Sequence, residues 1–392
     1  MLSADDAAAP DASTPDASTP GASATDDVVP ADATPGTGGG PVIAELSTLD
    51  RFLPVWIGLA MAGGLLLGRL VPGLNDDLER IKIDTVSLPI AIGLLAMMYP
   101  VLAKVRYTHI RDEVADRRTL GLSLVLNWLV GPLLMFTLAW VFLADLPELR
   151  TGLIIVGLAR CIAMVLIWND LADGSRELAA VLVAVNSLFQ IVMYSVLGWF
   201  YLSVLPGWLG LDTADLAVSL WDIARSVLIF LGIPLLAGFL TRTIGEARKG
   251  TEWYEGTFLP RIGPIALYGL LFTIVVLFAL QGEQITGHPL DVVRVAVPLL
   301  VYFGLMWGGA FTLGLRLGFP YERNASVAFT AAGNNFELAI AVSIAVFGVT
   351  SGQALAGTIG PLIEVPALVG LVYVSLWARR RFYPQAGHDP LV

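Results

Sequence analysis

The sequence predicts an all-α integral membrane protein with ten transmembrane helices, built as two inverted five-helix repeats in which helices 4 and 9 are discontinuous and cross. Three observations support this fold class. The 392 residues are 56% hydrophobic and only 14% charged, with a mean hydropathy of +0.74, and soluble domains of this size do not have such a composition. Ten apolar spans follow one another with short connections. The two halves of the chain also resemble each other at a spacing near 174 residues.

The first 50 residues differ from the rest of the chain. They hold nine acidic and no basic side chains, and 1–41 contains almost no large apolar residue. Because such a segment cannot bury enough apolar surface to offset its ordering entropy, we expect a disordered acidic tail. The segment lacks the basic start and apolar core of a signal peptide. The other 342 residues carry 24 of the 33 acids and all 23 bases, so their charge does not indicate a nucleic-acid partner.

The apolar spans are long enough to cross the roughly 30 Å hydrocarbon core of a bilayer. The expected domains are the tail at 1–50, a first repeat at 51–210, a second repeat at 211–384 and a C-terminal tail at 385–392. Because the connections are short, no second soluble domain fits between them. The spans lie near 52–70, 83–103, 119–143, 150–170, 177–204, 220–241, 259–281, 292–315, 324–348 and 353–378.

Lysine and arginine predict the orientation, since both are enriched on the cytoplasmic side of membrane proteins. With the N-terminus inside, the cytoplasmic segments hold sixteen of the 23 basic residues and the outer segments hold five, while Arg160 and Arg225 lie within spans. We therefore expect both termini in the cytoplasm and the protein in the plasma membrane.

The internal repeat predicts where a binding site lies. An offset of 174 places Arg160 on Asn334 and Cys161 on Asn335. Because each repeat has an odd number of spans, the second half enters the membrane upside down, and inverted repeats place their site at the repeat interface near the midplane. Local matches at offsets of 175 and 174 support the alignment: Leu88–Leu95 with Gly263–Leu271, and Ser187–Ile191 with Pro361–Val365.

The centre of the ninth span is poor helix material. Gly333, Asn334 and Asn335 favour a turn over a helix, and Glu337 follows them at mid-depth. The fourth span carries Arg160 at the equivalent depth. Broken helices near the midplane are how many secondary transporters build substrate and ion sites. The repeat therefore predicts that the two breaks meet, with the two asparagines supplying amide donors and acceptors.

Charged side chains inside the spans are functional candidates, because their burial in a membrane is costly. Glu337 is predicted either to bind and release a proton or to form a structural ion pair with Arg160. Arg160 cannot lose its proton, so Glu337 is its expected partner. Alternatively, Arg160 occupies the place that a sodium ion takes in related architectures, which favours proton coupling. Glu364, in the tenth span, is either a second ion or proton site or a hydrogen-bonding partner of the break.

Cys161 is the one cysteine of the chain. A lone buried cysteine is usually an inert small hydrophobe. Its neighbour Arg160 is expected to favour the thiolate, which is the form that binds soft ions. One sulfur makes a weak, reversible contact, which suits a carrier. A single cysteine excludes an intramolecular disulfide and a multi-cysteine metal site within one chain.

Two motifs carry a family resemblance. The fourth span contains Gly157–Val165, with the sequence GLARCIAMV, followed by Trp168 and Asn169, and the ninth contains Ala332–Ala341, with the sequence AGNNFELAIA. Both resemble signatures of the arsenite efflux permeases of the yeast-type arsenical-resistance family, over about 50–384. The resemblance implies a ten-span fold of two inverted repeats akin to the bile-acid/sodium symporters. It also implies export of arsenite, often with antimonite, driven by proton exchange.

The resemblance also implies roles for particular residues. It places the family's essential cysteine, the arsenite contact, at Cys161 and its essential acid at Glu337. The expected partners are arsenite, antimonite, protons and the lipid bilayer. No P-loop pattern is present, so neither an ATPase subunit nor a cofactor is expected.

Other readings of the sequence remain open. The alternative is a sodium-coupled organic-anion symporter of the same architecture, in which Arg160 grips a carboxylate or sulfonate. A receptor is disfavoured by the inverted repeat. An enzyme is disfavoured because the spans hold no histidine pair, no acid pair at metal-ligand spacing and no nucleophile with a base.

Overall fold

The computed structural model describes residues 52–71, 73, 82–83, 86–105, 117–211, 219–287 and 289–383. The predicted tails at 1–50 and 385–392 lie outside these residues. Helices make up almost all of the described part, as the sequence predicts, and β1 and β2 add an antiparallel pair of two-residue strands.

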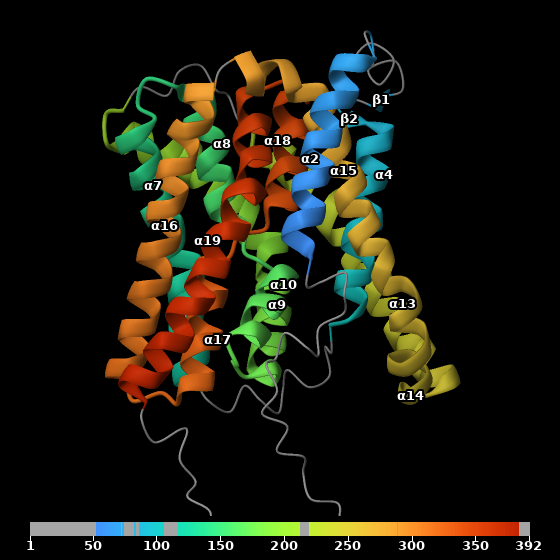
Figure 1. The fold of residues 1–392 in the computed structure, drawn as a ribbon, viewed down its shortest axis with the longest axis vertical. Coiled ribbons are helices and arrows are strands. Elements are labelled where there is room, and N and C mark those ends of the chain that lie inside the picture. Colours follow the sequence, from blue (N-terminus) through green and yellow to red (C-terminus); the bar gives the residue numbers. More distant parts are fainter. Residues whose placement is uncertain are drawn as a thin grey trace, which may run out of the picture. The chain divides into compact units, whose positions relative to one another are not determined.

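The elements in chain order (Figure 1) are α2 Leu53–Leu70, β1 Lys82–Ile83, β2 Val86–Ser87, α4 Leu88–Ala103, α6 Arg117–Val125, η2 Leu126–Val130, α7 Gly131–Phe142, α8 Pro147–Leu158, α9 Met164–Leu171, α10 Arg176–Trp199, η3 Phe200–Val204, α11 Leu205–Trp208, α12 Leu220–Val227, η4 Leu228–Gly232, α13 Ile233–Lys249, α14 Thr251–Trp253, η5 Tyr254–Phe258, α15 Leu259–Gly287, α16 Pro289–Arg316, α17 Tyr321–Ala332, α18 Phe336–Phe347 and α19 Gly352–Phe382.

The predicted spans correspond to three kinds of helix in the structure: long helices, shorter helices and pairs of half-helices. α2 and α4, at the first two spans, are shorter apolar helices. The predicted fourth span corresponds to α8 and α9 and the predicted ninth span to α17 and α18, so each predicted span contains a break. Six helical stretches are long and apolar enough to cross a membrane: Arg117–Phe142, Arg176–Trp208, Leu220–Lys249, Thr251–Gly282, Pro289–Arg316 and Gly352–Phe382.

Several long helices widen next to a proline. The segments η2, η3, η4 and η5 are five-residue π-helical turns, and each leads into an α-helix whose second residue is proline. Proline has no N–H to donate, and its ring clashes with the carbonyl four residues earlier. A π turn changes the hydrogen-bonding register of the helix at that point. The four prolines are Pro132, Pro206, Pro234 and Pro260.

Helix boundaries recur along the chain at the offset found in the sequence. α8 and α17 each contain twelve residues, and both their first and their last residues are 174 positions apart. The last residues of α7 and α16, and those of α11 and α19, have the same separation. The spacing near 174 is therefore a property of the helices as well as of the residue pattern.

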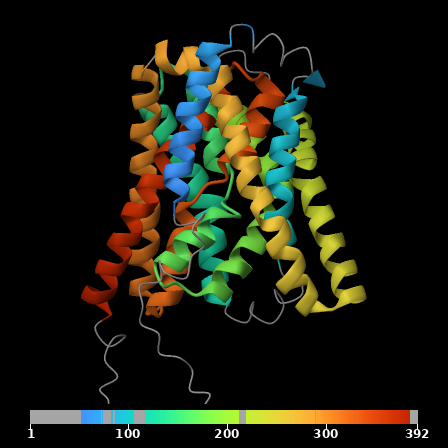
Figure 2. The same cartoon turned by 45° about the vertical axis from the view of Figure 1, so that its right-hand side comes forward.

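The helices that flank the breaks form two sets. α2, α4, α13 and α15 pack against one another along one flank, and the two views place them together (Figures 1 and 2). We call these four helices the lateral group. The half-helices α8, α9, α17 and α18 pack among α7, α10, α16 and α19. The breaks therefore lie inside the molecule, beside the lateral group.

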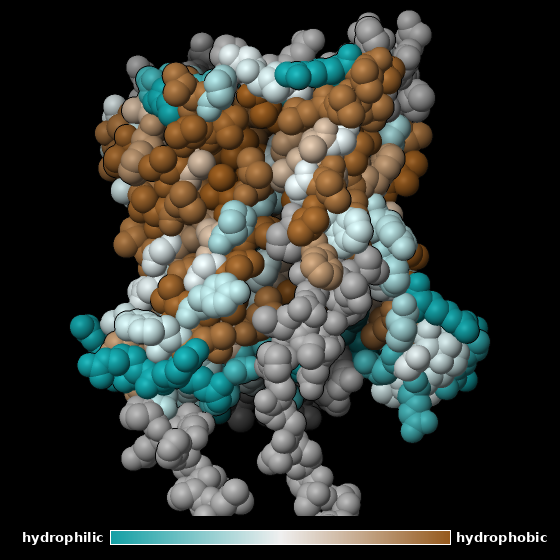
Figure 3. Space-filling view, in the orientation of Figure 1, coloured by the Kyte–Doolittle hydropathy of each residue, from teal (hydrophilic) through white to brown (hydrophobic). Residues whose placement is uncertain are grey.

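The distribution of apolar and hydrophilic residues on the surface is the one expected of a membrane protein. In the face seen in Figure 3, apolar residues cover the middle of the molecule and hydrophilic residues gather toward its ends. Exposed leucines and valines on several helices, such as Leu66, Val141 and Leu300, contribute to this apolar surface. An apolar surface of this extent is unusual for a soluble monomer and indicates contact with lipid. The multi-pass membrane protein predicted from composition is therefore consistent with the structure.

Candidate functional site

The two broken helices meet at their breaks. Between α8 and α9, and between α17 and α18, a few residues run in a non-helical conformation, and Arg160 forms an antiparallel bridge with Asn334. Two backbone hydrogen bonds flank the bridge: Cys161 N–H donates to the Gly333 carbonyl at 3.3 Å, and Asn335 N–H donates to the Ala159 carbonyl at 3.0 Å. Backbone groups released by a helix break inside a membrane need such partners. We call this pair of crossing stretches the ribbon.

A side-chain oxygen meets each outer edge of the ribbon. Gln190 of α10 accepts a hydrogen bond from Arg160 N–H through its Oε1 atom. Glu364 of α19 accepts one from Asn334 N–H through its Oε1 atom at 3.2 Å. Both acceptors are buried and lie 30 residues after their donors. Gln190 is also 174 positions before Glu364, so the two contacts match under the repeat.

Close packing explains why glycine stands at the break of the ninth span. A Cβ atom added at Gly333 would lie 2.9 Å from the Cβ of Cys161, closer than side chains approach. On its other side, the break is closed by Asn335, whose Oδ1 atom accepts the Leu338 N–H at 3.0 Å and caps α18. This is the N-cap role that asparagine fills well. Asn335 is buried, and its side-chain oxygen is engaged by the backbone of α18.

Cys161 occupies a comparable position at the start of α9. Its Sγ atom accepts the Val165 N–H at 3.3 Å, and its side chain is only 3% exposed. The carboxyl groups of Glu364 and Glu337 lie near this thiol. The structure therefore brings together Cys161 and both acidic candidates named from the sequence.

The guanidinium of Arg160 has neutral partners. Its Nη1 atom donates to the Tyr302 hydroxyl at 2.8 Å, and its Nη2 atom donates to Asn334 Oδ1 at 3.0 Å and to the Gly157 carbonyl. The side chain is fully buried. A Cβ atom at Gly131 would lie 2.7 Å from Nη1, so this glycine leaves the room that the guanidinium occupies.

The expected ion pair between Arg160 and Glu337 is wrong. Among the residues that the structure describes, Arg160 forms no ion pair. Its partners are instead the carbonyl of Gly157 and neutral side-chain oxygens. Helix C-termini carry partial negative charge, and both α8 and α17 end within three residues of the bridge. These two ends supply part of the compensation that a carboxylate was expected to give.

The expectation that Arg160 favours the thiolate of Cys161 is not supported by this geometry. Successive side chains of an extended chain point to opposite faces, and the Arg160 guanidinium contacts Tyr302 and Asn334. Arg160 therefore lies on a closed face of the ribbon, packed against α16.

A cavity of about 310 Å³ lies between the lateral group and the helices α9 and α10. Its charged wall residues are Glu337 and Lys104, and Cys161 is not part of the wall. Glu337 is half-buried there, whereas Glu364 is 1% exposed. The apolar wall consists of Met97, Val101, Val105, Ile162, Ala163, Met164, Leu166, Ile167, Ala180, Val183, Gly263, Ala266, Leu267 and Leu270.

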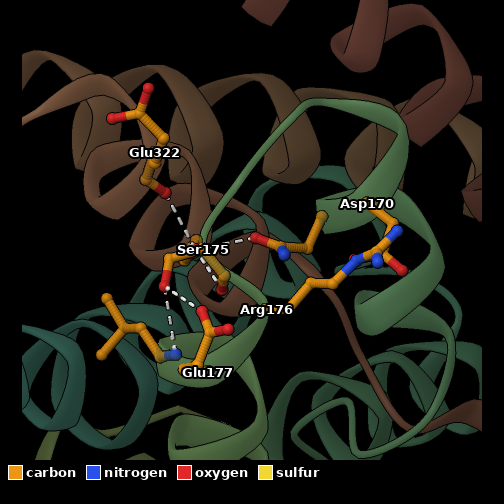
Figure 4. Close-up of polar contacts among 8 residues, drawn as sticks. Asp170, Ser175, Arg176, Glu177 and Glu322 are labelled. Carbon is orange, nitrogen blue, oxygen red and sulfur yellow. Dashed lines mark hydrogen bonds and ion pairs between the residues drawn. The ribbon is translucent and has the colours of Figure 1, made fainter. Parts of the chain in front are cut away.

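The far end of α9 is attached to α17 (Figure 4). Ser175 N–H donates to the Glu322 carbonyl at 3.0 Å, and Ser326 Oγ donates to the Ser175 carbonyl at 3.0 Å. Asp170 pairs with Arg176 at 3.0 Å in the same region, and its carboxyl is partly exposed. Asp170 therefore lies near the end of α9 in partial contact with solvent, away from the ribbon.

A matching attachment joins α8 to the start of α19. Glu148 Oε2 accepts the Gly352 N–H at 3.0 Å, and Glu148 is 174 positions before Glu322. In each broken helix, the first half therefore binds the turn after the other broken helix. α17 binds the turn after α9, and α8 binds the turn after α18. These contacts keep the four half-helices together as one unit.

Two contact residues of the ribbon were not predicted. Tyr302 lies in a segment of α16 that belongs to no motif, so no sequence signal identified it. Gln190 was visible as the repeat partner of Glu364, yet a neutral glutamine in a span carried no functional assignment. No group of three or more histidine, cysteine, aspartate or glutamate residues that could hold a metal ion occurs in the described part of the chain.

Comparison with known proteins gives a consistent result. The sequence pattern of the sodium bile acid symporter family matches residues 91–288. The arsenical-resistance protein Acr3 of Corynebacterium glutamicum is 61% identical over 347 residues, covering 88% of this chain and 93% of that protein. The arsenical-resistance protein Acr3 of Alkaliphilus metalliredigens is 31% identical over 350 residues, covering 87% and 95%. An uncharacterized transporter of Synechocystis is 37% identical over 348 residues, covering 84% and 88%.

Proposed function

Because the chain belongs to the sodium bile acid symporter family and to the Acr3 arsenical-resistance proteins, we propose that it exports arsenite from the cytoplasm in exchange for protons. As a member of these families it is a transporter and not an enzyme. The observation that carries the proposal is the position of Cys161, a soft ligand held at the crossing of two broken helices with Glu337 and Glu364 around it.

The proposed architecture is ten membrane spans in two inverted repeats of five. The offset of 174 in the helix boundaries, the bridge between Arg160 and Asn334, and the matched contacts of Gln190 and Glu364 support it. An antiparallel crossing is what two oppositely oriented repeats would form at their interface. In the proposed orientation both termini are cytoplasmic, as the bias of lysine and arginine predicts.

In the proposed binding step, arsenite enters as neutral As(OH)₃ and contacts the sulfur of Cys161. Trivalent arsenic is a soft centre that prefers sulfur to oxygen donors. One sulfur gives a reversible contact, and the Asn335 amide is available for a hydroxyl group because its Nδ2 atom lacks a partner among described protein groups. Antimonite, with the same valence and softness, is proposed as a second substrate.

The access route in this proposal is the 310 Å³ cavity, which reaches from Lys104 at the end of α4 to Glu337. In the proposed orientation Lys104 is cytoplasmic, so this conformation is open toward the cytoplasm. Movement of the four half-helices against the lateral group would close the cavity and open the other side. The attachments of Ser175 and Glu148 favour movement of the half-helices as one body.

Proton exchange is assigned to the two carboxyl groups. Glu337 lines the cavity, and Glu364 meets the ribbon and interacts with Glu337. A proton carried inward in exchange for a neutral substrate moves one positive charge down the membrane potential. Arg160 keeps its charge throughout, so the site retains a fixed cation and does not require sodium.

Everted membrane vesicles test this proposal. We expect arsenite uptake when the interior is made acidic, no uptake without the protein, and no change when sodium is replaced by potassium. Excess antimonite should compete with arsenite. Uptake that requires sodium, or that is unaffected by collapsing the proton gradient, would contradict proton exchange.

The second candidate is sodium-coupled transport of an organic anion, favoured by the family match over 91–288. The same vesicles distinguish it when a sodium gradient is imposed across the membrane and a labelled bile acid is added outside. Sodium-driven uptake of the bile acid without arsenite transport would support this alternative and overturn the first.

A further inference from the structure

The two edges of the ribbon have the same geometry and different chemistry. At one edge the acceptor is the neutral amide of Gln190, and at the other it is the carboxyl of Glu364. The acceptor strength of a carboxyl group changes with its protonation, whereas the amide oxygen accepts equally at any pH near neutrality. One edge is therefore insensitive to protons, and the other is sensitive.

The surroundings strengthen this difference. The ionisable groups that interact with Glu364 are Glu337 of α18 and Cys161 in the fourth-span break. Near Gln190 are Arg160, which keeps its charge, and Tyr194, whose hydroxyl donates to the Ile155 carbonyl at 3.1 Å. Arg160 is in turn held by Tyr302 and by the ends of the half-helices.

We propose that Gln190 is a positioning residue of the transport cycle: it holds the Arg160 edge of the ribbon in one geometry, and so keeps Cys161 in place, while the Glu364 edge changes with proton load. Cys161 directly follows Arg160, and its N–H is bonded to Gly333. A shift of the Arg160 backbone would therefore move the sulfur. This role rests on the proposed arsenite transport, although part of its test does not.

Removing and restoring the acceptor at position 190 tests the proposal. Gln190→Met has similar length but accepts no strong hydrogen bond, whereas Gln190→Glu restores an oxygen next to Arg160. We expect the KM for arsenite in everted vesicles to rise about tenfold in the Met variant, because a buried donor loses its partner. In the Glu variant, where an oxygen acceptor for the Arg160 N–H is restored, it should stay within about twofold of native.

A second measurement does not depend on arsenite. Cys161 is the chain's one cysteine, so maleimide labelling in membranes reports on that position alone. At one fixed pH, labelling should be about tenfold faster in Gln190→Met than in the native protein and close to native in Gln190→Glu. Gln281→Met is the matched control, because Gln281 is a buried glutamine of α15 that bonds to Val349 away from the ribbon.

The outcomes separate the two proposals. If the native protein transports arsenite but Gln190→Met has native KM and labelling, the positioning role is overturned. The same follows if Gln190→Glu fails to restore both values or if Gln281→Met behaves like Gln190→Met. If the native protein does not transport arsenite, the proposed function fails, and the labelling series still decides whether Gln190 holds the position of Cys161.

Discussion

The two helix breaks form one structure from two different sets of side chains. The break between α8 and α9 contributes Arg160 and Cys161, and the break between α17 and α18 contributes Asn334 and Asn335. The two backbones pair through two hydrogen bonds, and each break donates one of them. The comparison teaches that backbone pairing sets the crossing, while side chains decide what the crossing can bind.

The difference also separates two faces of the crossing. Arg160 is enclosed by Tyr302, Gly157 and Asn334. Cys161 instead interacts with Glu337, which lines a cavity, and with Glu364. Substitutions at the two faces should therefore have different consequences, and the following predictions run from the largest effect to the smallest.

Cys161→Ser should have the largest effect on transport. Serine keeps the size and hydrogen bonding of the site but offers a hard oxygen, so arsenite uptake should fall by about a hundredfold or more. Uptake in everted vesicles, normalised to the amount of inserted protein, measures this loss. Uptake equal to that of the native protein would make Cys161 a packing residue and remove the proposed distinction between the two faces.

Glu337→Gln should come next, because it keeps the shape of the cavity wall and removes the proton carrier. We expect uptake driven by the pH gradient to fall by about tenfold or more, with little response left to the gradient. Glu322→Gln is the control, since that side chain is 46% exposed and far along α17 from the break. A Glu337→Gln protein with unchanged pH dependence would leave Glu364 as the coupling candidate.

Gly333→Ala tests how closely the two breaks must approach. The added Cβ would stand 2.9 Å from the Cys161 Cβ, and overpacking of this kind costs about 1–3 kcal/mol. We expect a lower thermal midpoint and several-fold weaker uptake. Gly304→Ala is the matched control, because nothing lies within 4 Å of a Cβ there, and it should behave like the native protein.

Tyr302→Phe should have the smallest effect on transport of the four substitutions. It removes one hydrogen bond to Arg160 Nη1 while the contacts with Asn334 and Gly157 remain. A hydrogen bond to a charged group contributes about 1.5–3 kcal/mol, so the thermal midpoint should decrease with little change in the KM for arsenite. A large change in KM with an unchanged midpoint would place Arg160 in the substrate site and contradict the closed face.

Much of the fold was predictable because it depends on local composition and periodicity. Apolar length located the helices, and Gly333 with its two following asparagines located the break of the ninth span, where the structure places it. The repeat offset aligned Arg160 with Asn334 before any contact was known, and those two residues form the bridge. Cys161, Glu337 and Glu364 were candidates from their residue types alone.

The partners of Arg160 were not predictable in the same way. Charge alone favoured a pair with Glu337, since nothing in the sequence states which face of a break a side chain takes. Tyr302 stands 142 positions away in a helix without a motif. Its contact with Arg160 depends on how α16 packs against the ribbon.

The sequence by itself determined a polytopic membrane protein, an offset of 174 that aligns Arg160 with Asn334, and the residue types at the two breaks, because burial in lipid and helix propensity act on short stretches of chain. Only the tertiary structure decided that Arg160 turns to a closed face, that Gln190 and Glu364 meet opposite edges of the ribbon, and that Glu337 lines a cavity. Those relations depend on the packing of segments far apart in sequence, where a rotation of one extended residue exchanges the faces to which its neighbours point.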